Sequence, residues 1–351
     1  MNSHALRRPQ HLAVTVAAAG LAIGVPAQAA VADPTAAPSA SVAGGALVIT
    51  GTNAPDAIQI AVGTDPGTLL VDLGQQQTPL VLDRSTFSAI AVRLGNGDDS
   101  FVVVTSRGDV TTPLTVDGGN GNDAITGGSG NDLLDGGNGN DAILGGAGVD
   151  EISGDNGVDT IDGGVGTDTE FLDNGDDVAV WNPGEGSDII GGGNGLDTLV
   201  FNGSNGDERF DLSANGSSSL FTRNVGTVRM DMDSVEALAL ATLRGADSVT
   251  VHDLSQTSLR HAAIDLSADG LGDGQQDTIV VEGSAGPDHV DVTTDGAAVN
   301  VAGLGLETQL TGSESSDQLH VNTGAGDDTV QIGDGVAKLI GVTVDLGTDQ
   351  S

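Results

Sequence analysis

The chain contains no cysteine, no tyrosine and only one lysine among its 351 residues. Without cysteine it can form no disulfide, bind no metal through thiolates and carry no lipid on a cysteine. An exported protein of this composition needs another way to stabilise its fold, and bound metal ions are a common alternative to disulfides.

Positive charge is scarce throughout the chain. Lysine and arginine together number 11 against 50 acidic residues, which gives a formal net charge of −39. Between Arg107 and Arg209 there are 21 acidic residues and no basic one. Such a surface repels nucleic acid and anionic membranes, so we expect neither as a partner. Aliphatic residues are frequent and periodic, which argues against disorder as the explanation of this composition.

Familiar catalytic motifs are also missing. The sequence has no H-E-x-x-H segment of a zinc protease and no G-x-S-x-G segment of a serine hydrolase. His252, His289 and His320 alternate with aliphatic residues in strand-like segments, so we expect their side chains to face solvent. The sequence therefore favours a protein that is not an enzyme.

The N-terminal segment, up to Ala29, is typical of a secretory signal peptide. Arg7 and Arg8 precede a fourteen-residue apolar stretch from Leu12 to Val25, and a small-residue cleavage site ends at Ala29. Fourteen apolar residues are short for a membrane span, which disfavours an uncleaved anchor. We expect a secreted, extracellular protein that begins near Ala30, without membrane insertion, followed by an Ala/Pro linker over residues 30–42.

The most informative pattern is a row of aspartates at every ninth position within a glycine-rich stretch. The first five units, from Gly118, follow G-G-x-G-x-D-x-U-x closely, where U is isoleucine or leucine. The aspartates of the series are Asp123, Asp132, Asp141, Asp150, Asp159, Asp168 and Asp177.

The residue types explain the spacing. Glycines allow the backbone to turn tightly with positive φ and to point carbonyl oxygens inward, and the aspartate adds a carboxylate. The x-U-x triplet is a short strand that buries one aliphatic side chain. A flexible linker would not need an aliphatic residue at every ninth position, and the pattern does not fit an EF-hand loop.

This repeat resembles the RTX, or hemolysin-type, calcium-binding repeat family. The resemblance implies a right-handed parallel β-roll with two nonapeptides per coil, so that every second aspartate of the series belongs to the same row. It also implies that each Ca²⁺ lies between consecutive turns of a row, bound by carbonyl and aspartate oxygens, with about five ions or more. The implied ligands form one row of Asp123, Asp141, Asp159 and Asp177 and a second row of Asp132, Asp150 and Asp168, with Asp188 and Asp197 as further candidates.

Electrostatics supports a bound cation. Neighbouring strands lie about 4.8 Å apart, and two carboxylates at that distance repel each other by roughly 3 kcal/mol at an effective dielectric constant of 20. A divalent cation between them converts this repulsion into attraction. The donors are all oxygens from flexible loops, which favours Ca²⁺ over zinc, copper or magnesium.

A weaker repeat with a period of 40 follows. Asp277 matches Asp317 and Asp288 matches Asp328, each beside alternating aliphatic residues, and an earlier copy aligns at offset 41, with Val249 matching Val290. Residues 43–117 show similar strands. Alternation indicates half-buried strands that must stack, so we expect solenoid coils rather than a flanking β-sandwich. Most aspartates in these glycine-poor loops are expected to form turns, and Trp181 is expected to fill the core at a distorted coil.

The predicted fold is therefore all-β, with the RTX β-roll continued on both sides by a degenerate parallel β-solenoid. The predicted divisions are the signal peptide (1–29), the linker (30–42), an N-terminal solenoid (43–117), the calcium-binding roll (118–202) and a C-terminal solenoid (203–351). Two functions remain open. One is a calcium-rigidified structural or adhesive module that contacts cell-surface or matrix components. The other is a folding or secretion module for a partner enzyme or toxin.

Overall fold

A computed structural model describes residues 15–18, 21–24, 37–74, 77–268 and 270–347. The predicted signal peptide and most of the predicted linker lie outside the described residues, apart from an antiparallel pair of short strands, β1 (Thr15–Ala18) and β2 (Leu21–Gly24). Residues 39–42, also assigned to the linker, belong to strand β3 (Ser39–Ala43). The chain divides into two compact units, and the division follows Ala179, within strand β17 (Val178–Trp181).

The first unit consists of two sheets whose strands alternate along the chain. In spatial order, one sheet contains β3, β4 (Ala46–Thr50), β8 (Ala89–Asn96), β10 (Leu114–Asn120), β12 (Leu133–Asn138), β14 (Glu151–Asn156) and β16 (Thr169–Asn174). The other contains β7 (Leu80–Asp83), β6 (Thr68–Asp72), β5 (Ala57–Val62), β9 (Ser100–Val104), β11 (Ala124–Thr126), β13 (Ala142–Gly148) and β15 (Thr160–Gly166). Short 3-10 helices follow β7 (Arg84–Thr86) and β9 (Thr105–Arg107).

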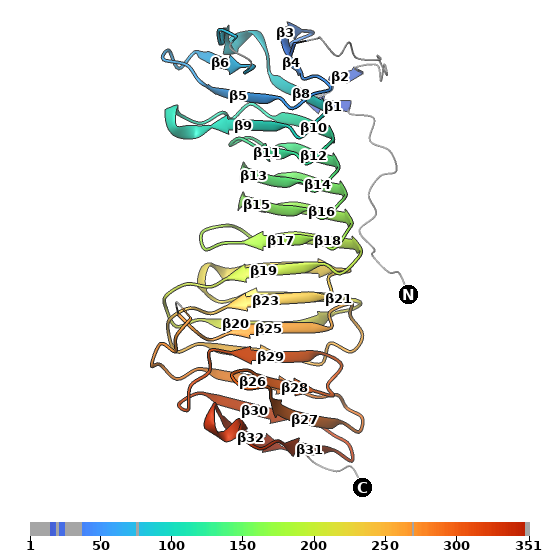
Figure 1. Cartoon of the computed structure of the whole chain (residues 1–351), viewed down its shortest axis with the longest axis vertical. Coiled ribbons are helices and arrows are strands. Elements are labelled where there is room, and N and C mark those ends of the chain that lie inside the picture. The colour runs from blue at the N-terminus through green and yellow to red at the C-terminus, as the bar shows by residue number, and fades with distance from the viewer. Residues whose placement is uncertain (1–14, 19–20, 25–36, 75–76, 269, 348–351) are drawn as a thin grey trace. The chain divides into compact units, whose positions relative to one another are not determined.

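The nonapeptide block forms the predicted parallel β-roll. Strand β12 pairs in parallel with β10 so that Leu134 lies beside Val116, two nonapeptides earlier in the chain, and the pairing of β13 with β15 has the same offset. In Figure 1 the strands β11, β13 and β15 lie one above the next. Each coil therefore contains two nonapeptides, as the family resemblance implies.

One aliphatic side chain per nonapeptide fills the interior of the roll. The residues at position U are at most 2% exposed, and they are Ile125, Leu134, Ile143, Ile152 and Ile161. The sixth unit has Glu170 at this position, and its carboxylate is also buried, with Oε1 accepting a hydrogen bond from the main-chain N–H of Gly163 at 3.2 Å. The block thus has a thin apolar core with an acidic side chain inside it.

The second unit is also built from two sheets. One contains β18 (Ile189–Asn194), β22 (Val228–Asp233), β21 (Ser218–Arg223), β20 (Arg209–Asn215), β24 (Ser248–Val251), β26 (Thr278–Glu282), β30 (Gln318–Asn322) and β32 (Gly341–Asp345). The other contains β19 (Thr198–Asn202), β23 (Ala237–Ala241), β25 (His261–Asp265), β29 (Glu307–Thr311), β28 (Val299–Ala302), β27 (His289–Thr294) and β31 (Thr329–Ile332). Two 3-10 helices, Val225–Thr227 and Val336–Lys338, complete it.

The coils of the second unit vary in length more than the sequence indicated. The predicted offset of 40 is confirmed where Thr278 pairs with Gln318 and Val290 with Val330. The alignment of Val249 with Val290 is wrong, because Val249 pairs with Ile279 instead. Ile279 and Val290 lie on the consecutive strands β26 and β27, and both strands alternate in the same way, so the pattern fits either register. Some coils are longer because they contain antiparallel strands, such as β21 between β20 and β22.

Candidate metal-binding turns

All the aspartates predicted as ligands are buried at the ends of turns. Their exposed fractions lie between 0% and 4%, and the residues are Asp123, Asp132, Asp141, Asp150, Asp159, Asp168, Asp177, Asp188 and Asp197. The first seven belong to the first unit, whereas Asp188 and Asp197 belong to the second. Ionisable groups are rarely buried so completely without a compensating partner, so these turns are the candidate site.

Main-chain hydrogen bonds join the aspartates into the two predicted rows. The N–H of Asp123 donates to Oδ1 of Asp141 at 2.8 Å, and the N–H of Asp141 donates to Oδ1 of Asp159 at the same distance. In the other row, Asp132 and Asp150 donate in the same way to the next aspartate of that row, at 2.8 Å. One oxygen of each acceptor carboxylate is therefore used to hold consecutive coils in register.

The second carboxylate oxygen distinguishes the turns from one another. In Asp123, Asp141, Asp150 and Asp159, Oδ2 is buried and has no hydrogen-bond partner within the described part of the chain. In Asp132, by contrast, Oδ2 accepts the N–H of Gly128 at 2.8 Å. An isolated carboxylate oxygen in the interior is strongly destabilising unless a cation is bound to it.

Backbone geometry places carbonyl oxygens beside these carboxylates. Gly119 and Gly121 have φ of +99° and +133°, values that favour glycine, and the equivalent glycines recur in the following turn of the row. A Cβ added to Gly118 would lie 2.7 Å from Oδ2 of Asp123 and would overlap the carbonyl oxygen of Gly136. Carboxylate and carbonyl oxygens of successive turns thus converge where the sequence has its first glycine.

Burial raises the pKa of these carboxyl groups. Desolvation is the largest cause throughout; neighbouring carboxylates raise the pKa further at several positions, and main-chain hydrogen bonds partly oppose it. The pKa of Asp123, Asp132, Asp150 and Asp168 is raised to about 6, and that of Asp159 to about 7. Asp141 and Asp177 have a raised pKa for the same reason. Ionised carboxylates in these turns are therefore less favourable than free ones, and a bound cation would offset that cost.

The donor set fits calcium. Among the described residues, no group of three or more histidine, cysteine, aspartate or glutamate side chains converges on one point. The main-chain carbonyl oxygens beside the carboxylates, such as that of Gly136, are further oxygen donors for an ion in these turns. Calcium accepts six to eight oxygen ligands with flexible geometry, whereas zinc and copper prefer nitrogen or sulfur. Which of the predicted aspartates bind an ion stays a prediction.

The hydrogen-bonded rows also extend into turns that sequence reasoning did not assign to the metal site. Asp56 donates to Asp99, and Asp99 to Asp123, at 2.7 and 2.8 Å. In the second unit, Asp247 donates to Asp277 and Asp277 to Asp317, at 2.8 and 3.0 Å. The sequence pattern did include the aspartate of each Gly/Asp loop, but the loops have few glycines, so most of these aspartates were expected to form turns.

Several flanking turns satisfy their carboxylates with protein groups. Oδ2 of Asp56 accepts the N–H of Thr52 at 2.7 Å, and Oδ2 of Asp288 accepts that of Ser284 at 3.0 Å. Glu208, buried at 1% exposure, is neutralised by Arg223, whose Nε donates to Oε1 at 2.6 Å. Protein groups thus satisfy the carboxylates of these turns, and the expectation that most flanking aspartates form turns stays a prediction.

The remaining residues singled out in the sequence have structural surroundings. Trp181 is 1% exposed and stacks on Phe201 with ring centroids 4.1 Å apart, which confirms its place in the core. His252 is on the outer face as expected, but its ring nitrogens lie 2.7 Å from Glu282 and 2.9 Å from Asp211, and these carboxylates raise its pKa against the effect of burial.

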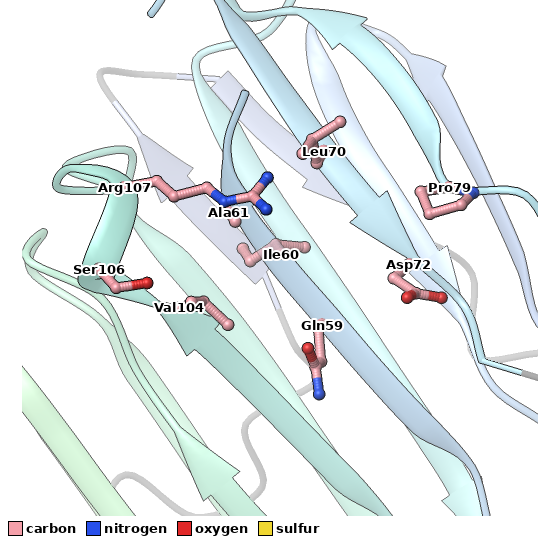
Figure 2. Close-up of a pocket in the computed structure, with 9 residues that line it drawn as sticks. All are labelled: Gln59, Ile60, Ala61, Leu70, Asp72, Pro79, Val104, Ser106 and Arg107. Carbon is pink, nitrogen blue, oxygen red and sulfur yellow. The ribbon is translucent and has the colours of Figure 1, made fainter. Parts of the chain in front are cut away.

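A shallow groove lies on the outer face of β5, β6 and β9, with a volume of about 290 Å³. Figure 2 shows Arg107 reaching across the strand that carries Ile60 and Ala61, with Asp72 on the neighbouring strand. Its nine lining residues include one carboxylate and no histidine. This lining does not offer the pair of acid and base groups that hydrolytic sites use.

Comparison with protein families identifies the central block. The family model of the RTX calcium-binding nonapeptide repeat, which spans four copies, matches residues 117–152, 135–170 and 144–179. Residues 117–179 carry RTX calcium-binding nonapeptide repeats. The block is thus a calcium-binding β-roll module, and the residues matched contain both rows of aspartates described above.

The chain was also compared with solved structures and with curated proteins. A solved structure similar to the chain is the solution structure of the AlgE6R3 subunit of the mannuronan C5-epimerase of Azotobacter vinelandii, with 26% identity, a TM-score of 0.16, and coverage of 52% of this chain and 73% of that one. A search of curated proteins finds no match. Among the described residues, no helix has the length and apolar character needed to cross a membrane.

Proposed function

We propose that this protein is exported and that its RTX block folds on binding Ca²⁺, so that the chain becomes a rigid structural or adhesive module outside the cell. The observation that carries the proposal is the set of buried carboxylate oxygens without a protein partner in the described part of the chain. They occur at successive turns of one row, in Asp123, Asp141 and Asp159, and at Asp150 of the other row.

The balance of energies in the block supports folding coupled to metal binding. Each nonapeptide buries about one aliphatic side chain, worth roughly 1.5–3 kcal/mol, while each ordered backbone residue loses about 1–2 kcal/mol of conformational entropy. Buried carboxylates with raised pKa oppose folding further at neutral pH. When bound, Ca²⁺ would neutralise these groups and join consecutive turns, and its binding energy would become folding energy.

Sequence features support the remaining parts of the proposal. The apolar stretch from Leu12 to Val25 and the cleavage site near Ala30 support export. Free calcium is abundant outside cells, where a cysteine-free chain gains most from a metal-dependent fold. We also propose that the protein is not an enzyme, because the conspicuous buried polar groups are those of the repeat turns.

The test is circular dichroism of the purified chain in chelator, in millimolar calcium and in millimolar magnesium. We expect calcium to increase the β-sheet signal strongly and magnesium to have little effect, because Mg²⁺ needs a stricter octahedron of ligands. Identical spectra in calcium and in chelator would contradict folding on binding. If calcium does fold the chain, an assay of calcium-dependent adhesion to cells or polysaccharide would distinguish an adhesive role from a purely structural one.

A further inference from the structure

The turn at residues 94–99 lies outside the family match, yet its sequence repeats a turn inside it. Residues 94–99 read L-G-N-G-D-D, and residues 172–177 read L-D-N-G-D-D. The second of these lies within the matched stretch 144–179 and ends in Asp177. The two turns differ at one position of six, so residues 94–99 have the residue types of a nonapeptide turn.

The backbone of this turn has the geometry of the block. Gly95 and Gly97 have φ of +110° and +134°, close to +99° and +133° at Gly119 and Gly121. Strands β8 and β10 pair so that Gly95 lies beside Gly119. A Cβ added at Gly119 or Gly121 would overlap the carbonyl oxygen of Gly95 or Gly97, just as the equivalent atoms would overlap between later turns of the row.

Asp99 occupies the place of a row aspartate. It is 3% exposed, its Oδ1 accepts the N–H of Asp56 at 2.7 Å, and its own N–H donates to Oδ1 of Asp123 at 2.8 Å. Its Oδ2 is buried without a hydrogen-bond partner among the described residues, as in Asp123, Asp141 and Asp159. An oxygen in this situation indicates a ligand that the protein itself does not supply.

The turn 94–99 begins with leucine at the position where the first turn of the block, 118–123, has glycine. Leu94 is fully buried, and so is Leu172, which starts the matching turn inside the block. In both cases the carbonyl oxygen faces the preceding turn of the row, because a Cβ added to Gly51 would overlap the oxygen of Leu94 and one added to Gly154 would lie 2.9 Å from that of Leu172. The carbonyl oxygens that face turn 118–123 are those of Gly95 and Gly97, which a Cβ on Gly119 or Gly121 would overlap.

We propose that turns 94–99 and 118–123 hold one further calcium ion, with Asp99 and Asp123 as its carboxylate ligands. The inference extends the proposed calcium-dependent function by one site beyond the matched repeats. Asp123 is then not the end of its row, as the sequence indicated, but its second member. The series of calcium ligands ends at Asp99, because Oδ2 of the next carboxylate in the hydrogen-bonded row, Asp56, accepts the N–H of Thr52.

The coil length explains why the repeat pattern missed this site. Asp99 precedes Asp123 by 24 positions, compared with 18 between Asp123 and Asp141, because the coil includes the 3-10 helix Thr105–Arg107 and the loop that follows it. A turn can keep its ligands while the connection behind it lengthens, since only the turn and its strands must stack.

The experiment counts calcium bound per full-length chain by equilibrium dialysis and elemental analysis. The variants are Asp99→Asn, Asp56→Asn as a matched control in the neighbouring turn, and Asp159→Asn as a positive control inside the matched block. Asparagine keeps an oxygen that can accept the row hydrogen bond, so the fold should survive, and circular dichroism in calcium checks this. We expect Asp99→Asn to bind one ion fewer than wild type and Asp56→Asn to bind the same number.

A wild-type count for Asp99→Asn, together with a reduced count for Asp159→Asn, would overturn this inference and leave the proposed function intact. A wild-type chain that binds no calcium would overturn both. Hydrogen exchange of the wild-type chain gives a readout that needs no variant. The amides of residues 95–98 should exchange at least tenfold more slowly in calcium than in chelator, and equal rates would also overturn the site.

Discussion

Replacing Asp159 by asparagine should stabilise the calcium-free protein and weaken the calcium-bound one. Asp159 is fully buried, its Oδ1 accepts the N–H of Asp141 at 2.8 Å, and its Oδ2 has no partner within the described residues. Asparagine is nearly isosteric and keeps an oxygen for the N–H of Asp141, but it cannot ionise. The substitution therefore removes the charge with little change of shape.

The free-energy cost of the ionised Asp159 carboxylate in the calcium-free fold follows from the shift in its pKa. Burial raises the pKa of Asp159 from 3.8 to about 7. The neutral carboxyl therefore stabilises the folded chain fully below pH 4, and this contribution is lost as the pH rises to about 7. Since each pKa unit corresponds to about 1.36 kcal/mol, the ionised carboxylate should disfavour the calcium-free fold by about 4 kcal/mol above pH 7. Screening by water and salt lowers this to about 2 kcal/mol.

The assay compares the free energy of folding in chelator and in calcium at pH 7.5. In chelator the wild-type block can be unfolded. Titration with a stabilising osmolyte such as trimethylamine N-oxide then drives it to fold, so that the free energy of folding can still be measured. We expect Asp159→Asn to be about 2–4 kcal/mol more stable than wild type there. In calcium the order should reverse, because Asp159 lies between Asp141 and Asp177 and its charge serves two pairs of turns.

Asp288→Asn is the matched control, because protein groups already occupy both of its oxygens. Oδ2 accepts the N–H of Ser284 at 3.0 Å and Oδ1 accepts the hydroxyl of Ser284 at 3.2 Å. The amide NH2 of asparagine is a donor and would face a donor of Ser284. The folding stability of this variant should therefore fall by about 1–2 kcal/mol both in chelator and in calcium. If Asp159→Asn behaved in the same way, the buried carboxylates would not be an electrostatic penalty that calcium relieves.

Three further predictions concern the whole chain. Acidification from pH 7.5 to 5 should increase the β-sheet signal of the calcium-free protein, because protonation relieves carboxyl groups whose pKa is raised to 6–7, such as Asp99 and Asp159; an unchanged circular dichroism spectrum would argue against this. Hydrogen exchange in chelator should be fast across Gly118–Phe171 and slow near the buried Val249 and Val290, and uniform rates would mean that the chain opens as a single unit. N-terminal sequencing of the exported protein should start within a few residues of Ala30, whereas an intact Met1 on membrane-bound material would contradict export as a soluble protein.

The nonapeptide block was predictable because everything that defines it is local. One nonapeptide contains a complete turn and strand, so glycines, aspartate and one aliphatic residue recur at fixed positions, and Ile143 and Ile161 lie inside as expected. The flanks were predictable only as strands. Val249 fits the pattern of either Ile279 or Val290, because alternation with a period of two does not say which coil stacks on which.

The sequence by itself determined the repeat and a donor set that favours calcium, because both depend on short-range spacing and donor chemistry, and its resemblance to the RTX family implied the parallel roll and the two rows of aspartates. Only the tertiary structure decided which carboxylates are already satisfied. Asp132 and Asp150 occupy the same position of the repeat, yet Oδ2 of one accepts the N–H of Gly128 while Oδ2 of the other has no partner among the described residues. Membership of a row depends in the same way on coil lengths and stacking, which is why Asp99 joins Asp123 across a longer coil. Hydrogen bonding between coils is a contact between distant segments, and no local pattern encodes it.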